Sequence, residues 1–509
     1  MDSEYPPLPS SNTVGDGDDG MLATFESDLS LNTQSIVDDG DIILEYARGS
    51  GTRAAHRWRA SSESLIQSSP YFRALLDPTK FAEGRSLKRQ RELRSATAGG
   101  ATVPSDSNPP TIRLPDDHLP LRVPSDTIGF FLRVLSAVSY SEGDRKSFDA
   151  EVRSQRPSFV AGLIELADAF NSPEVVRDTL QGAGYSLGKP KLPMTRFNTS
   201  MLKLNEDRIR QSIFIANFLN DRTALQMLTH ALIVAGSKYW VNGFETPEND
   251  APSWQYFSDG LEEELYYRRQ SVLNTITDLQ AYFLRIYGAF EEPTPIKSII
   301  STASLSGFRQ NQPQNQYQCR CGLGNSSACD AFHLGQMTRF FTLRTKTIFI
   351  GSTLINPDFY PDVENSASDS GPETRSNRST PSADITSVIS SLKQCPDYQI
   401  DSNHIACGIR RRLLPSLDCI DGFVGDERGL LGVNLNYWHG QGSTSAGRKW
   451  PHINGSWANR SHRRALVLDL RLSKISGVPV MSAGGSGAQF REEDARLLFT
   501  ARKRNWESL

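Results

Sequence analysis

Cysteine is scarce in this chain, with 6 residues among 509. So few cysteines in a chain of this length do not form the disulfide framework of a small secreted domain. The first residues also lack the basic segment and apolar core of a secretory signal. We therefore expect reduced thiols or metal ligands, and a location in the cytoplasm, the nucleus or both.

Long apolar runs are also absent. Hydrophobic residues make up 38% of the chain, and no run reaches the length that spans a bilayer, so a membrane partner is not expected. The formal net charge is −3, so no global basic field attracts nucleic acid. This composition is typical of folded domains that are separated by polar linkers.

Basic residues are missing at the beginning of the chain, where no Lys or Arg precedes Arg48. Residues 1–37 are rich in Asp, Ser, Gly and Pro, which predicts a disordered acidic tail. Two other polar stretches, 84–110 and 361–382, are predicted to be insertions. The first contains a cluster of basic residues, which is compatible with a nuclear-localisation signal or with a solvated loop.

The clearest pattern of short elements lies in the stretch Asp41–Glu83. Apolar segments predict strands at 41–46 and 55–60, with a glycine-containing turn between them. Serines at 61 and 62 predict the start of a helix. Pro70 predicts the start of a second helix, because its missing N–H costs nothing in the first helical turn.

This stretch resembles the BTB/POZ domain, an α+β family of protein–protein docking domains. The resemblance is carried by Asp41, Trp58, Ser61, Leu65, Ser69, Tyr71 and Phe72. It continues through apolar helical segments at 130–140 and 160–170, which implies a domain over residues 38–188 that includes the insertion. Ser61 stands where the family usually has histidine, and this alters the polar centre of the family's usual dimer interface.

The resemblance also implies a partner. Many BTB/POZ proteins are substrate adaptors of cullin-type ubiquitin ligases, and such adaptors carry a hydrophobic-x-Glu motif after the second helix. This chain, which resembles them there, has Phe81-Ala82-Glu83. An aromatic side chain that fills a pocket, with a carboxylate at the edge, can anchor a partner. Phe81 and Glu83 are therefore the candidate partner-binding residues, with a cullin scaffold or a second copy of the chain as the partner.

Residues 195–300 have a helical pattern throughout. Its most regular part predicts an amphipathic helix of about 30 residues. The apolar face of this helix consists of Leu265, Val272, Ile276, Leu279, Phe283, Ile286 and Phe290. Such a face can pack on the preceding helices or pair with another chain as a coiled coil. A further short helix is predicted at 385–392.

Cysteine and histidine gather in the remaining region, residues 301–509, which contains the insertion at 361–382. A Cys-x-Cys turn can present two thiolates to one Zn²⁺, and ligands four residues apart lie one helical turn apart. The candidate ligands are Cys319, Cys321, Cys329, His333, His404 and Cys407. Either the first four close a local site, or ligands from both sides of the insertion combine. Without a metal, the cysteines would pack as small hydrophobic residues.

Three segments outside the first domain resemble those of BTB proteins from filamentous fungi, and this likeness implies no chemistry. They are Glu262–Arg269, Asp397–Pro415 and Leu498–Trp506. No His-Glu-x-x-His motif or comparable catalytic pattern occurs, so an enzyme is not expected and a structural zinc is the only cofactor considered.

The sequence therefore predicts a BTB/POZ domain followed by a mainly α-helical region, in a protein–protein interaction protein that serves as a ubiquitin-ligase adaptor. A nuclear regulator of transcription or chromatin is the first alternative. A metal-dependent enzyme in the C-terminal half is the second.

Overall fold

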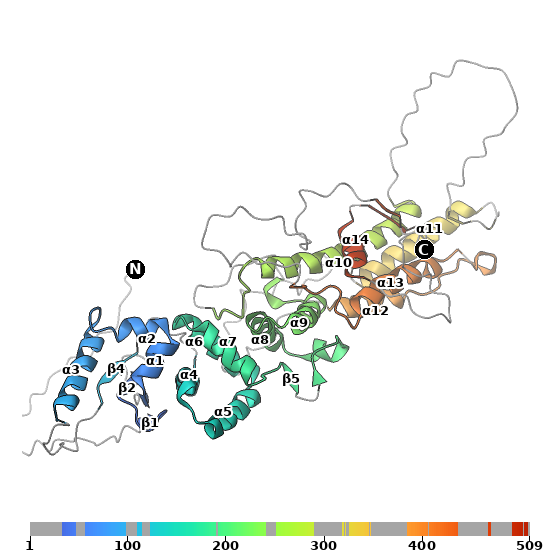
Figure 1. Ribbon diagram of the computed structural model, residues 1–509. Helices are drawn as coiled ribbons and strands as arrows, with labels where there is room; N and C mark the ends of the chain where they lie inside the picture. The colour runs from blue at the N-terminus through green and yellow to red at the C-terminus, as the bar shows by residue number, and fades with distance from the viewer. Residues whose placement is uncertain are drawn as a thin grey trace, which may run out of the picture.

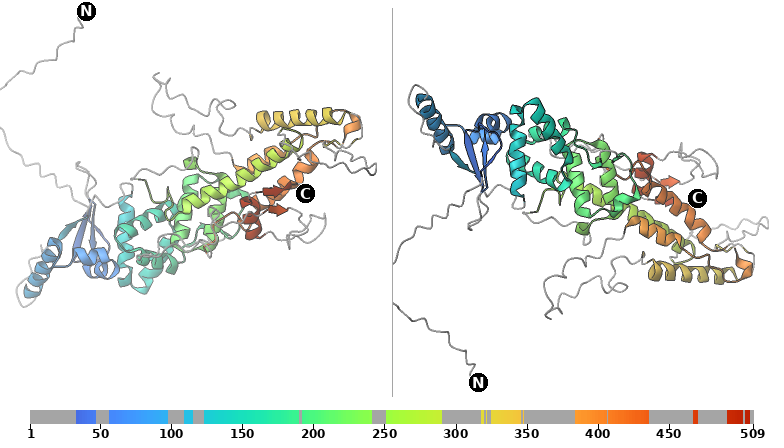
Figure 2. Two further views of the ribbon diagram at one scale, coloured as in Figure 1. Left: turned by 90° about the horizontal axis from the view of Figure 1, so that it is seen from above. Right: turned by 90° about the horizontal axis from the view of Figure 1, so that it is seen from below.

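The computed structural model describes residues 33–46, 56–97, 109–114, 123–189, 192–240, 251–289, 318–319, 321, 325–345, 347, 384–405, 407–435, 467–469, 491–501 and 503–506. The chain is elongated, with a small sheet at one end and the helices of the C-terminal half at the other (Figure 1). Figure 2 shows the same progression from two further directions. Buried apolar residues form one continuous cluster that extends from Ile42 to Trp506.

A four-stranded mixed sheet forms the N-terminal end, with the strand order β1-β3-β2-β4. The strands are β1 (Thr33–Ser35), β2 (Ile42–Tyr46), β3 (His56–Ala60) and β4 (Thr111–Arg113). β2 and β3 are antiparallel, with Leu44 opposite Trp58, and β4 runs parallel to β2. Alternate residues of β2 are buried, as expected for a strand with one face on the core. The strands predicted at 41–46 and 55–60 are confirmed.

The sheet begins earlier than the sequence pattern indicates. Residues 33–35 fall within the predicted acidic tail, yet they form β1, which pairs in parallel with β3. The Gln34 side chain accepts a hydrogen bond of 3.2 Å from Trp58 Nε1. The tail prediction is therefore wrong for these residues, because three polar residues carry no apolar pattern and gain their strand structure only from a neighbouring strand. Residues 1–32 lie outside the described ranges.

A succession of helices follows the first three strands. They are α1 (Ser62–Ser68), α2 (Pro70–Leu75), α3 (Ala82–Thr97), α4 (Ser125–Ser136), the short η1 (Ala137–Ser139), α5 (Glu142–Ser154), α6 (Pro157–Ala169) and α7 (Pro173–Gly182). Ser61 and Ser69 cap α1 and α2, and each side chain accepts a backbone N–H. Pro70 occupies the first turn of α2, as predicted.

Ser69 and its neighbours also connect α2 to the end of α6. Ser69 Oγ donates a hydrogen bond of 2.8 Å to the carbonyl oxygen of Phe170. The Phe72 ring stacks on the Phe170 ring at a centroid distance of 5.4 Å, and Tyr71 meets the same ring edge-on at 5.0 Å. Ser69, Tyr71 and Phe72, which carry part of the sequence resemblance, thus connect α2 to the residue that follows α6.

The first part of the stretch 84–110, which was predicted to be an insertion, is helical and belongs to α3. Arg91 on this helix donates to Asp41 at 2.9 Å, and Asp41 also accepts the Ser62 backbone N–H at 2.7 Å. Burial raises the pKa of Asp41, but the hydrogen bonds from Ser62 and Arg91 outweigh burial and lower the pKa below its ordinary value. The loop prediction is wrong for residues 84–97, because contacts with distant residues and burial of Leu87 support a helix whose own sequence is polar.

The central region is helical, as predicted. It contains α8 (Glu206–Phe218), α9 (Arg222–Ala235) and α10 (Leu261–Ile286), with the short elements β5 (Gly188–Lys189), β6 (Leu192–Pro193), η2 (Thr199–Lys203) and η3 (Lys238–Trp240). Helix α10 has 26 residues and confirms the predicted amphipathic helix as far as Ile286, whereas Phe290 of the predicted face lies outside the described residues. Leu265, Val272 and Leu279 on its apolar face are buried, and the helix packs on α9 and on α14 (Glu492–Thr500). Its face is therefore occupied within the chain, which leaves no exposed seam for a coiled coil.

The remaining elements complete the C-terminal half. They are α11 (Ser326–Arg339), the π-helical turn η4 (Phe340–Arg344), α12 (Ile385–Lys393), η6 (Ser402–His404), α13 (Arg410–Val424), β7 (Val467–Asp469) and β8 (Lys503–Asn505). Helix α12 confirms the helix predicted at 385–392. The insertion predicted at 361–382 lies outside the described residues.

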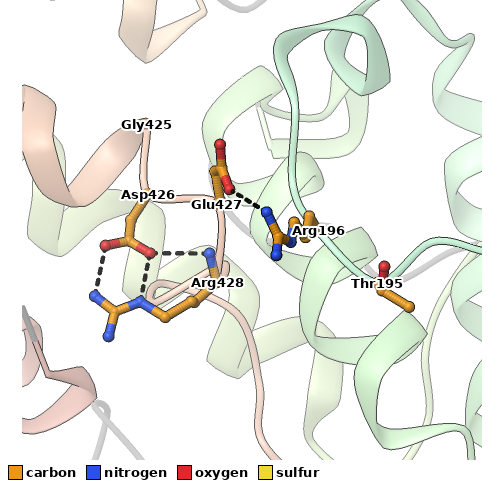
Figure 3. A pocket seen from close by; sticks show the side chains of 6 residues that line it. All are labelled: Thr195, Arg196, Gly425, Asp426, Glu427 and Arg428. Carbon is orange, nitrogen blue, oxygen red and sulfur yellow. Dashed lines mark hydrogen bonds and ion pairs between the residues drawn. The ribbon is translucent and has the colours of Figure 1, made fainter. Parts of the chain in front are cut away.

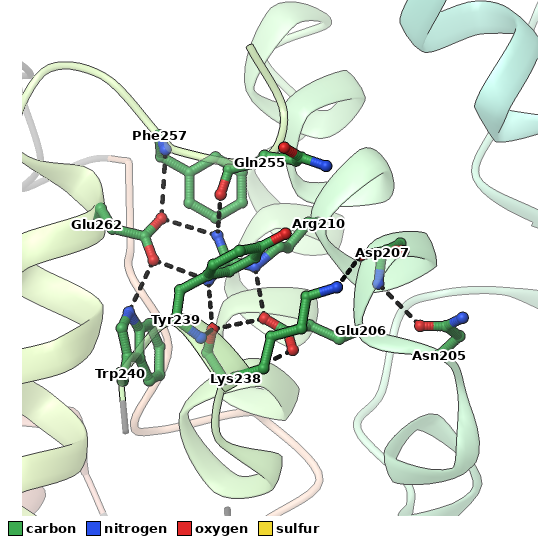
Figure 4. Close-up of polar contacts among 11 residues, drawn as sticks. Asn205, Glu206, Asp207, Arg210, Lys238, Tyr239, Trp240, Gln255, Phe257 and Glu262 are labelled. Carbon is green, nitrogen blue, oxygen red and sulfur yellow. Dashed lines mark hydrogen bonds and ion pairs between the residues drawn. The ribbon is translucent and has the colours of Figure 1, made fainter. Parts of the chain in front are cut away.

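A buried ion network joins α8 to α10 (Figure 4). Arg210 is fully buried and donates two hydrogen bonds to Glu262, at 2.8 and 2.9 Å, and one to Glu206 at 2.8 Å. Glu262 also accepts hydrogen bonds from Trp240 Nε1 at 2.7 Å and from the Phe257 backbone N–H at 3.2 Å. These additional donors offset the cost of removing the charges from water.

His230 connects α9 to the end of α13. Its Nε2 lies 2.9 Å from the carbonyl oxygen of Val424, and the Leu431 backbone N–H lies 3.1 Å from Nδ1. Since a carbonyl only accepts and an N–H only donates, the ring is neutral with its proton on Nε2. Burial lowers the pKa of His230 to about 4.

Acidification should therefore lower the stability of the protein through His230. Its pKa in the unfolded chain is about 6.5, so the unfolded state binds more protons as the pH falls towards 4. The contribution of neutral, buried His230 to the free energy of unfolding is complete above pH 6.5. As the pH falls below 6.5 this contribution is lost, and the total loss is about 3 kcal/mol. Urea unfolding at several pH values measures this loss. The His230→Gln variant, which can still donate and accept, should lose less stability than the native protein over this range, and equal losses would contradict the assignment.

Candidate metal centre

Four side chains with metal-ligating atoms meet in the C-terminal half. Cys319, Cys329, His404 and Cys407 are buried, and their ligand atoms all lie within 4.8 Å of one another. Cys319 Sγ is 3.3 Å from His404 Nδ1 and 3.7 Å from Cys407 Sγ. Zinc bonds of about 2.0–2.3 Å in a tetrahedron place neighbouring ligands roughly 3.3–3.8 Å apart. This cluster can therefore hold a metal ion such as zinc.

The four ligands come from two parts of the chain. Cys319 precedes α11 and Cys329 lies in that helix, whereas His404 ends η6 and Cys407 lies shortly before α13. The Asp401 side chain caps η6 by accepting the Asn403 N–H at 2.7 Å. A hydrogen bond of 3.2 Å from the Cys407 N–H to the His404 carbonyl then closes a turn, and His404 Nδ1 lies 3.7 Å from Cys407 Sγ.

Neighbouring polar groups orient the ligands. Asn325 Oδ1 lies 3.1 Å from His404 Nε2. The amide oxygen is an acceptor, so Nε2 carries the proton and Nδ1 presents its lone pair to the cysteine sulfurs. The Asp330 carboxylate accepts the backbone N–H groups of Gln318 and Cys319, at 2.7 and 3.0 Å. It thereby fixes the segment that carries Cys319.

Two further side chains connect the cluster to the helices around it. Tyr287 Oη donates a hydrogen bond of 2.8 Å to the carbonyl oxygen of Cys407. Arg412 donates to Tyr287 Oη at 2.5 Å and to Gln318 Oε1 at 2.8 Å. Sequence reasoning placed Arg412 in a basic cluster beside the possible metal site but missed Tyr287, Asn325 and Asp330, because no local pattern marks residues that support a site only through tertiary contacts.

The thiols of the cluster differ in acidity. Burial raises the pKa of Cys319, but hydrogen bonds from the Cys321 backbone and from neighbouring side chains outweigh burial and lower it to about 7. Burial raises the pKa of Cys329 to about 11 and also raises the pKa of Cys407. Among these three thiols, Cys319 is therefore the most acidic. A cation would favour the thiolate form of all three.

The other two candidate ligands lie outside this group of four. Cys321 is partly exposed, and its Sγ is 3.2 Å from Cys407 Sγ. His333 lies one helical turn beyond Cys329 on α11, and its ring faces Tyr287 at a centroid distance of 5.8 Å. Its Nε2 is buried without a hydrogen-bond partner among the described residues. The structure thus combines ligands across the chain and does not close a local site from 319, 321, 329 and 333.

The N-terminal candidates lie far along the chain from this cluster. Phe81 immediately precedes α3 and is 47% exposed, and Glu83 lies in the first turn of that helix with partial exposure. Burial raises the pKa of Tyr71, and the nearby Glu83 carboxylate raises it further. The Glu83 carboxylate therefore lies near the Tyr71 hydroxyl group.

A separate pocket of about 550 Å³ lies between residues 195–196 and the turn that follows α13 (Figure 3). Arg196 faces Glu427 at 3.3 Å, and Arg428 pairs with Asp426 at 2.8 Å. Thr195 and Gly425 complete the lining. The charged groups that line this pocket therefore pair with one another.

Comparison with known proteins identifies no relative. No protein-family model, no curated protein and no solved structure matches this chain. Within the described ranges, no helix has both the length and the apolar character that crossing a membrane requires.

Proposed function

We propose that this chain is a protein–protein interaction protein whose N-terminal unit is a docking domain of the BTB/POZ type. The sheet and the helices that follow it support this proposal. An antiparallel pair, β2 and β3, leads into two short helices, and β4 returns to lie parallel to β2. Leu65 and Phe72, two residues of the sequence resemblance, are fully buried there.

The exposure of Phe81 is the observation that carries the proposal. A large aromatic side chain that remains 47% exposed at the start of a helix is available to a partner. Beside it, a groove of about 460 Å³ lies between the end of α2 and α3, with Leu76, Pro78 and Leu87 in its lining. The charged groups of the groove are paired, since Lys88 faces Glu92 at 3.9 Å and Arg91 pairs with Asp41, so an apolar occupant would match it.

A cullin-type scaffold is the partner we propose, with the chain as a substrate adaptor in the cytoplasm or the nucleus. The helical region and the C-terminal half would then recruit the substrate. Exposed Arg85, Lys88 and Arg89 on α3 favour the nuclear regulator as the second candidate, because a basic helix surface can be read by import factors or by nucleic acid.

We also propose that the metal held by the cluster is zinc in a structural role. Three cysteines and one histidine match its preference for soft ligands and tetrahedral geometry. Four protein ligands leave no position for water or substrate, and this supports a structural role over a metalloenzyme.

Capture of a panel of cullin scaffolds by the full chain tests the docking proposal. The full chain is required because α6 packs on α8, so truncation after residue 188 would expose apolar surface. The Phe81→Ala, Glu83→Ala variant should bind at least about tenfold more weakly, the expected effect of losing an interface anchor.

The exposed Leu93 on α3 provides a matched control, since Leu93→Ala also removes exposed apolar surface from this helix and should retain binding. Failure of the folded native chain to capture any cullin would overturn the adaptor proposal. Self-association without capture would favour a scaffold that binds its own copies.

A further inference from the structure

Five potential ligands meet in a place where tetrahedral zinc accepts four. Cys319, Cys329, His404 and Cys407 form the compact group, and Cys321 is the additional thiol. The inference below rests on the zinc proposed above. It concerns what the fifth thiol does when the other four hold the ion.

Cys321 differs from the other thiols in two respects. It is partly exposed, whereas Cys319, Cys329 and Cys407 are buried, so a small solute in water reaches Cys321 first. Its Sγ also lies only 3.2 Å from Cys407 Sγ, which is closer than the 3.7 Å between Cys407 and Cys319. An accessible outer thiol is therefore already in contact with one of the proposed zinc ligands.

We propose that Cys321 is a site of oxidation by hydroperoxides, and that its disulfide with Cys407 releases the zinc. In the first step the Cys321 sulfur attacks one peroxide oxygen, an S–O bond forms, the O–O bond breaks and water leaves. In the second step the Cys407 sulfur leaves zinc and attacks the Cys321 sulfur, an S–S bond forms and hydroxide leaves. Two electrons pass from the two sulfurs to one hydrogen peroxide, which ends as water and hydroxide.

The disulfide removes one of the four ligands. Zinc then keeps only Cys319, Cys329 and His404, which hold it less tightly than four ligands do, and the disulfide becomes the connection between the segment before α11 and the turn before α13. Because zinc binding is coupled to folding, loss of the ion changes the local structure around Cys319, Cys329 and His404, and with it the part of the C-terminal half that we propose recruits a substrate. Reduction of the disulfide restores the thiolate and the site.

The experiment treats the zinc-loaded full chain with hydrogen peroxide and follows zinc release with a chromogenic chelator. We expect the native protein to release its zinc and to form a Cys321–Cys407 disulfide, identified by peptide mapping. The Cys321→Ser variant should contain zinc before treatment and should release it at least about tenfold more slowly, because the remaining thiols are buried and ligated. The control Cys419→Ser changes a partly exposed thiol on α13 that is outside the cluster, and it should behave as the native protein does.

Failure of the zinc proposal and failure of the inference about Cys321 would give different experimental results. Native protein that cannot be loaded with zinc would overturn the zinc proposal itself. A Cys321→Ser variant that lacks zinc before treatment would show that Cys321 is a ligand and would overturn only the present inference. Release from Cys321→Ser at the native rate, or a disulfide between other cysteines, would also overturn it.

Discussion

Chelation of zinc from the full chain is expected to unfold the region around α11 and α13 while the N-terminal unit stays folded. The ion would join Cys319 and Cys329 to His404 and Cys407, which lie on the other side of residues 330–403 in the sequence. Apparent zinc-binding energies of about 10–16 kcal/mol in zinc-finger peptides set the upper scale of the effect. Loss of several kcal/mol is enough to unfold a marginally stable region.

Hydrogen exchange measured by mass spectrometry, with and without chelator, locates this change. Peptides from α11, η6 and the start of α13 should lose protection, whereas peptides from α4 and α6 should not, because these helices pack mainly on each other and on α1, α7 and α8. Cys407→Ser should reproduce the chelated state without chelator, and Cys419→Ser should not. Unchanged protection in the chelated protein would contradict a structural role for the metal.

Replacement of Arg210 by methionine is expected to destabilise the protein by about 3–5 kcal/mol, the typical cost of breaking a buried ion pair by removing one partner. Glu262, which is 2% exposed, would then keep its charge without the two hydrogen bonds from the guanidinium. Arg210 also stacks near the rings of Tyr239 and Phe257, at 4.9 and 5.3 Å, and methionine preserves only part of this packing. Chemical unfolding of both proteins under the same conditions measures the difference.

Two comparisons separate the charge effect from loss of volume. Lys146→Met removes an exposed i,i+4 pair with Glu142 and should change the free energy of unfolding by less than about 1 kcal/mol. The double variant Arg210→Met, Glu262→Gln should be less destabilised than the sum of the two single variants, because neutralising Glu262 removes the isolated buried charge. Strict additivity of the two substitutions would argue against a coupled network.

The elements that were predictable from sequence are those whose pattern is local. Helix α10 follows from its apolar spacing, and its buried face matches that spacing. Strands β2 and β3 and the starts of α1 and α2 follow from short apolar segments, serine caps and Pro70. β1 and α3 were not predictable, because polar residues become ordered there through contacts with β3 and Asp41.

The tertiary structure also decides where charged side chains lie. Charged residues on an amphipathic helix usually form a solvated face. Glu262, Glu264, Arg268 and Arg269 are instead buried, and Arg269 donates to the carbonyl oxygens of Ile233 and Val234 at the end of α9. Burial of charge depends on partners that other helices supply, and no local pattern indicates those partners.

In the candidate metal centre, too, some features followed from the sequence and others only from the tertiary structure. The sequence alone identified the ligand types, the two clusters in which they occur and the short spacings that suit one ion. Only the tertiary structure selected Cys319, Cys329, His404 and Cys407, left His333 facing Tyr287 and placed Cys321 against Cys407. The physical reason is that local spacing determines helices, strands and turns, whereas the meeting of residues 319–329 with 404–407 depends on how α10, α11 and α13 pack.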